Sequence, residues 1–393
     1  MGELQSLLLV LSLIYLSECL VWVRRGAAAF ANWWSPNYSI RHPGTLAGNH
    51  RGGWLLANPF PPLDGLFLAA PLPFSLSPQA VYAYCSACLN PAGRPPHTGK
   101  LLHWDKFQSI RIHSRNLEVN GELFLTAFST FAARRAGELL RRLAKLNPPD
   151  RAGEFRRALL ATLDATKIAR RLEEYRKLSR PIRLLANPLF VYLFVIVPPF
   201  LWRYGFGAPG LGLLAGMLAF TVPIAVLFRR AHRSLFPDAE EERFKPFLTM
   251  LLAPPAAIRA PDLLGRHLLE EFHPLGIARV LASPARFRRL ADQLLRDLRY
   301  PLFPVCPTTE PVAVQTEEWF RLALLEAVEK FLAKEGLDPH QLAAPPKPSE
   351  PVNVSFCPRC QAQFVRRDGA CADCGGRPLQ AFSSAPEASR SLS

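Results

Sequence analysis

The sequence of 393 residues predicts a multi-domain membrane protein with three transmembrane α-helices, a β-rich cytoplasmic domain, an α-helical cytoplasmic region and a small C-terminal metal-binding module. Three observations predict this class. There are three apolar runs long enough to cross a bilayer, basic residues that gather on one side of these runs, and four late cysteines in two CxxC pairs. The formal net charge of +15 therefore matters through its distribution along the chain.

The first apolar run, residues 4–23, has the length of transmembrane helix 1. A cleaved signal peptide is the alternative, and it carries its positive charge before the apolar stretch. Here Glu3 precedes the run, whereas Arg24 and Arg25 follow it, as in a stop-transfer segment. We therefore expect a retained anchor.

The second and third apolar runs, residues 184–202 and 211–228, contain no charged residue and predict transmembrane helices 2 and 3. Their prolines would break soluble helices but are tolerated in membrane helices. Gly212 and Gly216 form a GxxxG pattern, which allows two helices to approach closely. The alternative is two buried helices of a globular core.

The basic residues set the expected orientation in the membrane. Between Arg134 and Arg183 there are 15 Lys or Arg and 6 Asp or Glu, whereas the loop 203–210 has only Arg203. By the positive-inside rule the N-terminus and this loop lie outside, and the C-terminus lies in the cytoplasm. The prediction is an integral protein of a bacterial-type inner membrane, with its late cysteines in a reducing compartment.

The regions between the spans have different patterns. Short apolar or alternating runs between 39 and 125, with an Asn120–Gly121 hairpin turn, predict strands that a helix near 130–146 closes. This order loosely resembles the pleckstrin-homology-like superfold, which by itself fixes no function.

The predicted parts in chain order are transmembrane helix 1 (4–23), the β-rich cytoplasmic domain (39–146), a basic juxtamembrane helix (152–182), transmembrane helices 2 and 3 (184–202 and 211–228), a helical cytoplasmic region (238–336), a proline-rich linker (343–352), the metal-binding module (353–382) and a disordered tail (383–393).

The basic juxtamembrane helix offers arginines to anionic lipid headgroups, each contributing about 1 kcal/mol near the surface. The alternative is a solvated helix that follows the positive-inside rule.

The metal-binding module has the pattern CxxC-x10-CxxC, formed by Cys357, Cys360, Cys371 and Cys374. Each CxxC places two sulfurs on one metal, so the two pairs can complete a tetrahedron of thiolates. So short a module cannot bury a sufficient core, and the bound metal must supply much of its folding energy. Asp368–Gly369 lies between the pairs and predicts a hairpin turn.

Residues 354–380 resemble the zinc-ribbon family through both cysteine pairs, this turn and the glycines after the second pair. The resemblance implies one structural Zn²⁺, with contacts to protein or nucleic acid. It does not imply catalysis, because four protein ligands leave no open position on the metal. Gln361 departs from the family, which has Gly after the first pair. Iron in the same thiolate site is the alternative metal.

Other candidate site residues lie in the β-rich domain. Cys85 and Cys88 form a lone CxxC that could bind a second metal with His97 or His103, or be redox-active. We expect both to be core cysteines, because strand residues three apart point to opposite faces. His50, Arg51 and His103 are the candidates for a catalytic site, should the protein be an enzyme. The second and third spans carry no Asp, Glu, Lys, Arg or His at mid-depth, which disfavours ion transport.

The sequence favours a non-catalytic role, in which a membrane-anchored scaffold or assembly protein presents its ribbon to a cytoplasmic protein partner. One alternative is a membrane-bound enzyme with a site in 39–125, and the other is a membrane-tethered nucleic-acid binder. Nucleic acid is not the expected partner, because the ribbon has four arginines and two aspartates and is therefore only mildly basic. Expected partners are therefore the lipid bilayer and one cytoplasmic protein.

Overall fold

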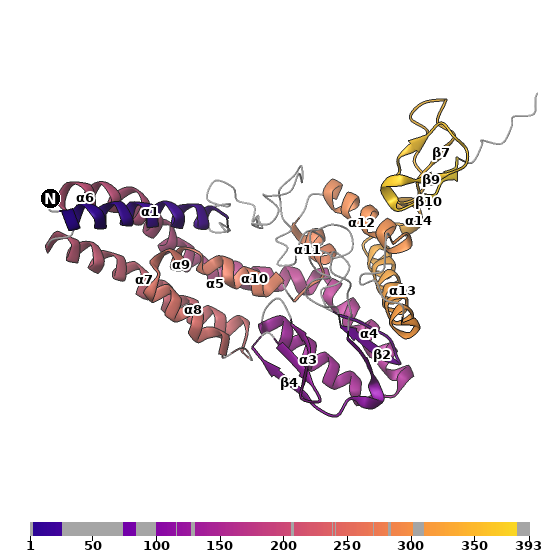
Figure 1. The fold of residues 1–393 in the computed structure, drawn as a ribbon, viewed down its shortest axis with the longest axis horizontal. Coiled ribbons are helices and arrows are strands. Elements are labelled where there is room, and N and C mark those ends of the chain that lie inside the picture. The colour runs from indigo at the N-terminus through magenta and orange to yellow at the C-terminus, as the bar shows by residue number, and fades with distance from the viewer. Residues whose placement is uncertain are drawn as a thin grey trace, which may run out of the picture. The chain divides into compact units, whose positions relative to one another are not determined.

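The computed structural model describes residues 3–25, 74–83, 100–114, 116–126, 130–205, 208–237, 239, 241–269, 271–281, 284–301 and 310–382. These residues are mostly helical, with small open sheets (Figure 1). The chain divides into two compact units. The first comprises residues 1–63, 110–140 and 162–283, and the second comprises residues 64–109, 141–161 and 284–393.

One long helix dominates the first unit. It runs over 40 residues from Ala165 to Tyr204, and within the described part of the chain it is the one helix long and apolar enough to cross a membrane. Its segments are α5 (Ala165–Val191), a π-helical turn η3 (Tyr192–Ile196) and α6 (Val197–Tyr204). Pro198 and Pro199 begin two residues after the last residue of the π turn. They have no N–H to donate, which accounts for the altered hydrogen bonding there.

The predicted basic helix 152–182 forms two helices, α4 (Pro148–Leu163) and α5. The Asp164 side chain accepts hydrogen bonds from the N–H groups of Thr166 at 3.0 Å and Lys167 at 3.1 Å. An aspartate in this position caps a helix N-terminus, so a new helix begins after it.

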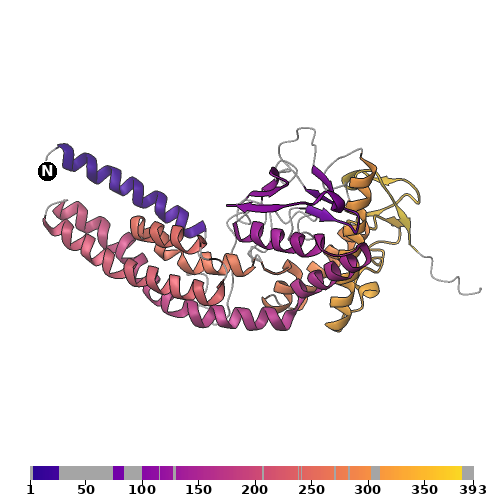
Figure 2. The same ribbon diagram turned by 90° about the horizontal axis from the view of Figure 1, so that it is seen from below.

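Helix α7 (Ala208–Leu235) packs along α5, η3 and α6 (Figure 2). The Tyr192 hydroxyl donates a hydrogen bond of 2.8 Å to the Leu213 carbonyl. A Cβ at Gly216 would overlap that hydroxyl, whereas one at Gly212 would meet open space. Only the second glycine of the GxxxG pattern therefore serves a close approach within the described chain. Helix α1 (Glu3–Arg25), which contains the first apolar run, contacts α6 and η3.

Four more helices complete the first unit, of which one packs against α7 and the other three contact α5. They are α8 (Glu241–Leu252), α9 (Pro254–Ile258), α10 (Ala260–Leu269) and α11 (Pro274–Leu281). The buried Tyr175 hydroxyl of α5 donates a 2.8 Å hydrogen bond to the Pro261 carbonyl. Arg171 donates to the Leu235 carbonyl at 2.7 Å and to Glu271 at 3.2 Å. The predicted cytoplasmic region 238–336 is thus divided, since its first half joins the unit of α5 and α7.

The described strands between residues 74 and 126 form two separate three-stranded sheets of sequential antiparallel order. In the first unit, β4 (Ile110–His113), β5 (Asn116–Val119) and β6 (Glu122–Thr126) pack against α3 (Thr130–Ala144), where Gly137 lies against Ile112 and Leu117. Asn120 and Gly121 both have positive φ, as the predicted hairpin turn requires. The second sheet belongs to the second unit. The described strands therefore do not join into one closed sheet like that of the expected superfold.

The second unit is built on α13 (Pro311–Lys334), which packs against β1 (Phe74–Leu76) and β2 (Ala80–Ala83). Strand β3 (Lys100–His103) pairs with β2, and the short helix η2 (Trp104–Lys106) follows it. Phe155 of α4 contacts the rings of Trp319 and Phe320 on α13. Helices α12 (Pro284–Arg299) and α14 (Pro339–Leu342) complete the helical part of this unit.

A substitution at Gly276 on α11 tests how closely this helix must approach Leu163 and Ile168. An added Cβ would lie 3.1 Å from the Leu163 backbone and 2.7 Å from Ile168. Gly276→Ala should therefore lower the free energy of unfolding by about 1–3 kcal/mol. Gly153→Ala on α4, where a Cβ meets nothing within 4 Å, should leave it unchanged or raise it by up to about 1 kcal/mol. Denaturant titration in detergent measures both, and equal effects would contradict this packing.

Candidate metal centre

The C-terminal module consists of two small sheets. Strands β7 (Ser355–Phe356), β8 (Gln363–Phe364) and β11 (Gln380–Ala381) form a three-stranded sheet in the order β11-β7-β8. Strands β9 (Ala370–Cys371) and β10 (Arg377–Pro378) form a two-stranded one. A short helix, η4 (Ala372–Cys374), follows β9. The predicted turn at Gly369 has φ of 134°, which favours glycine.

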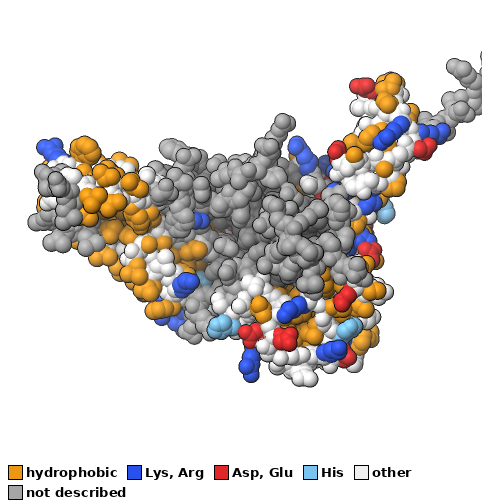
Figure 3. Space-filling view, viewed as in Figure 1, with side chains coloured by type: hydrophobic (Ala, Val, Ile, Leu, Met, Phe, Trp, Pro, Cys, Tyr) orange, Lys and Arg blue, Asp and Glu red, His pale blue; other side chains and the backbone are white. Residues whose placement is uncertain are grey.

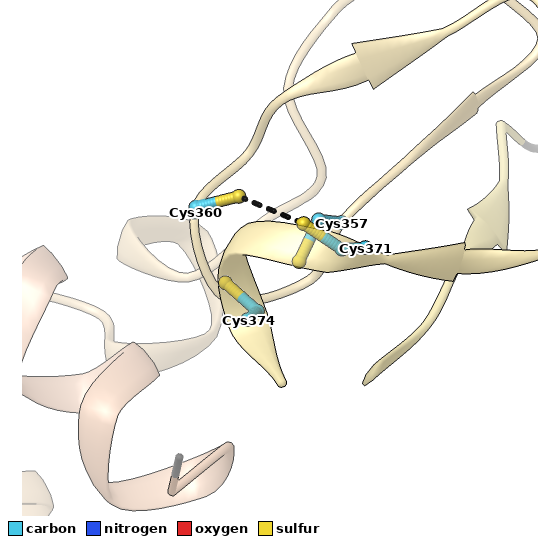
Figure 4. A group of neighbouring side chains, drawn as sticks. All are labelled: Cys357, Cys360, Cys371 and Cys374. Atoms are coloured by element: carbon cyan, nitrogen blue, oxygen red, sulfur yellow. Dashed lines mark hydrogen bonds between the residues drawn. The ribbon is translucent and has the colours of Figure 1, made fainter. Parts of the chain in front are cut away.

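Four cysteines converge between these sheets (Figure 4). Cys357 follows β7 and Cys360 lies in the turn after it, while Cys371 ends β9 and Cys374 ends η4. Their four sulfurs all lie within 4.8 Å of one another, and Cys360 Sγ is 3.8 Å from Cys371 Sγ. A tetrahedral metal with bonds of about 2.3 Å to sulfur needs sulfurs about 3.8 Å apart. The cluster could therefore hold one metal ion with little rearrangement.

The two CxxC turns close with different hydrogen bonds but share a left-handed residue directly after the second cysteine. The N–H of Gln361 donates to the Cys357 carbonyl at 2.9 Å, and the N–H of Gly376 donates to the Cys371 carbonyl at 3.0 Å. The residue after each pair is left-handed, with φ of 61° at Gln361 and 63° at Gly375. Gln361 thus adopts the conformation that glycine has at the same place in the second turn. This conformation costs a non-glycine residue about 1 kcal/mol.

The electrostatics of the four thiols favour a bound cation. The loss of water around its sulfur raises the pKa of the Cys360 thiol to about 12, and the three neighbouring thiols add to this rise. Burial likewise raises the pKa of Cys374. At Cys357 burial is the largest influence and opposes ionisation, but hydrogen bonds from the backbone N–H groups of Cys360 and Arg359 and from the neighbouring thiols together lower the pKa. The cluster therefore ionises fully only when a cation offsets the charge of its thiolates.

The metal-binding module docks on the end of α12 through one arginine from each cysteine turn. Arg359 Nη2 lies 2.7 Å from Asp297 Oδ1, and both side chains are largely buried. Arg377 Nη2 donates to the Pro301 carbonyl at 2.6 Å, and its guanidinium lies 5.5 Å from the centre of the Tyr300 ring. Burial raises the pKa of Asp297, although the Arg359 guanidinium opposes that rise. The proline-rich linker thus does not keep the module apart from the helices of its unit.

The structure brings together the four cysteines that the sequence predicted as metal ligands. Of the other candidates, His103 lies in β3 and is half-buried. His50, Arg51, Cys85, Cys88 and His97 lie outside the described residues. Sequence reasoning missed Asp297 and Pro301, because their place beside the module depends on packing across 62 and 76 positions of the chain.

Comparison of the chain with protein-family models, with curated proteins and with solved structures gives no match. The case for the metal centre therefore stands on its geometry.

The Arg359–Asp297 pair can be tested by a double-mutant cycle. Arg359→Leu leaves Asp297 as a buried, unpaired charge and should lower the free energy of unfolding by about 3 kcal/mol. Arg359→Leu combined with Asp297→Leu should recover at least half of this loss, since no charge is then buried alone. The matched control, Arg367→Leu at an exposed position of the same module, should stay within about 0.5 kcal/mol. Additive losses would show that the two side chains do not interact.

Proposed function

We propose that the chain is a membrane-anchored zinc-ribbon protein with a non-catalytic role, which presents its ribbon to a protein partner in the cytoplasm. The observation that carries this proposal is an exposed apolar stripe on the ribbon, formed by Val352, Val354 and Val365. Soluble modules of this size rarely leave several large apolar side chains together at the surface without a partner.

Zinc is the metal that best fits the donor set. Four thiolates at tetrahedral separations are typical of structural Zn²⁺ sites, which leave no position for water or substrate. In such a site the metal fixes the fold of its module and does no chemistry. The ribbon therefore acts through its surface.

The membrane anchor rests on the apolar helices of the first unit. The helix Ala165–Tyr204 has the length and composition of a span, and α1 and α7 contain the other two apolar runs of the sequence. Figure 3 shows hydrophobic side chains gathered over the end of this unit that α1 and α6 form. With the basic residues in the cytoplasm, the N-terminus lies outside and the ribbon lies inside the cell.

The proposed partner surface lies beside strands β7 and β8 of the ribbon. Ser355 pairs with Phe364, so the next register position places Val354 opposite Val365. Val365 has 70% of its surface exposed. The cysteine turns, in contrast, face α12 through Arg359 and Arg377.

The same contacts disfavour nucleic acid as the partner. Two of the four ribbon arginines, Arg359 and Arg377, already bind groups of the second unit. A third, Arg366, donates to the Ala370 carbonyl at 2.8 Å and lies over the Phe364 ring. A phosphate backbone needs several cationic side chains that point outward together.

The partner surface can be tested by photocrosslinking in cells. A photoreactive phenylalanine analogue at Val365 should give one discrete protein adduct, because this side chain would lie in the interface. The same analogue at Asp373, exposed at the cysteine turns, should give none. Val354→Asp should lower the Val365 adduct at least about fivefold, since a charge in an apolar contact is costly, while the metal content stays unchanged.

Three outcomes would contradict the proposal. They are no adduct at Val365, equal adducts at Val365 and Asp373, and an adduct that nuclease treatment removes.

A further inference from the structure

The segment 244–258 in the first unit is apolar but too short to span a bilayer. Between Pro246 and Ile258 its 13 residues include no charged side chain. A span needs about 20 such residues, whereas 10 to 14 are typical of a core helix or of a segment that enters the membrane and returns. The chain bends in the middle of this segment, where α8 ends at Leu252 and α9 begins at Pro254.

This segment packs against the apolar helices and not only against the basic part of α5. Helix α8 lies along α7, and α9 contacts α1, α5 and α7. Met250 and Ala257 belong to the same buried core as Leu189 and Ile224. Pro254 and Pro255 line an apolar cavity of ≈ 470 Å³, whose remaining lining residues all lie in or next to the three predicted spans. The bend therefore reaches the depth of the spans.

The contacts of α8 indicate how far the bend enters. The Arg229 guanidinium lies 5.8 Å from the centre of the Phe247 ring, and Arg229 directly follows the predicted span 211–228. Phe247 is thus level with the cytoplasmic end of that span. Pro254 follows seven residues later, and seven residues of helix rise about 10 Å. The bend would then reach about a third of the way into a hydrocarbon core about 30 Å thick.

The backbone at the bend suits a medium without water. The N–H groups of Ala253 and Ala256 donate to the carbonyls of Thr249 and Ala253, each at 2.8 Å. Pro254 and Pro255 between them have no N–H, and all residues of α9 are buried in protein. Irregular backbone at membrane depth is tolerated only where its polar groups are satisfied and buried in this way.

The outer face of α8 carries large apolar side chains at a spacing of four residues. Phe244, Leu248 and Leu252 are all exposed, Phe244 by 66% and Leu252 by 76%. Residues four apart share one helix face, so these side chains form a stripe. On the neighbouring α7, Val222 and Val226 are exposed as well. The stripe therefore extends the apolar surface of the predicted spans.

We propose that residues 244–258 form a re-entrant hairpin in the cytoplasmic leaflet, with Phe244, Leu248 and Leu252 against lipid acyl chains. The inference rests on the proposed membrane anchoring and deepens it. It moves the first helices after the third span from the cytoplasm into the bilayer.

Photolabelling from the lipid tests the hairpin in the native sequence. The full-length protein is reconstituted in phosphatidylcholine vesicles that contain a small fraction of a phosphatidylcholine with a diazirine on its acyl chain. Irradiation, trypsin digestion and mass spectrometry then compare three peptides, 244–259, 184–203 and 322–330. The second contains a predicted span. The third contains Leu322, which is exposed on α13 and serves as the background control.

The hairpin predicts labelling of 244–259 within about threefold of 184–203 and at least about tenfold above 322–330, because its stripe touches acyl chains. Fragmentation should place the adducts on Phe244, Leu248 and Leu252, with none on Met250, which is fully buried. If 184–203 is labelled and 244–259 stays at background, the hairpin is wrong and the membrane anchor stands. A second copy of the chain that covered the stripe would give the same result and would equally contradict its contact with lipid. If 184–203 also stays at background, the anchor is wrong and the hairpin with it.

Discussion

The convergence of four cysteines on one site that could hold a single cation organises the C-terminal part of this protein. The sulfurs of Cys357, Cys360, Cys371 and Cys374 lie within 4.8 Å of one another, at separations that suit one tetrahedral ion. Burial holds the pKa of two of the thiols above the ordinary range, so the charges cannot develop together without a metal. Strands of two residues each cannot supply this order by themselves, because they bury too little apolar surface.

The cysteine turns also position two arginines that contact other residues of the second unit. Arg359 lies inside the first turn and Arg377 shortly after the second, and both reach the end of α12. A metal that fixes the turns would therefore also fix the side of the metal-binding module that faces α12. The valines beside β7 and β8 stay exposed, which is why a structural metal is consistent with a role in binding. A different constraint organises the first unit. Its helices have apolar outer faces, and such faces are unfavourable in water.

Several features were accessible to sequence reasoning because they depend on local chemistry. The cysteine cluster follows from CxxC spacing, the left-handed Asn120–Gly121 turn from its residue types, and the helical apolar runs from composition. Other features depend on distant packing and gave no such signal. The Arg359–Asp297 pair, the separation of strands β1 to β6 into two sheets and the packing of α8 and α9 against α7 belong to this class. A short apolar helix has the same sequence pattern in the core of a soluble protein and in a membrane. Asp164 is an intermediate case, because it could be identified as a helix cap only after the break was seen.

The metal content of the purified protein tests the central claim most directly. Elemental analysis should find about one zinc per chain, because four thiolates complete one site. Cys360→Ser should reduce this to near zero, since three thiolates in a module with little core cannot hold both the metal and the fold. Cys19→Ser, which changes a cysteine of α1 outside the cluster, should retain the full equivalent. A protein without zinc, or a Cys360→Ser protein that keeps a full equivalent, would contradict the account.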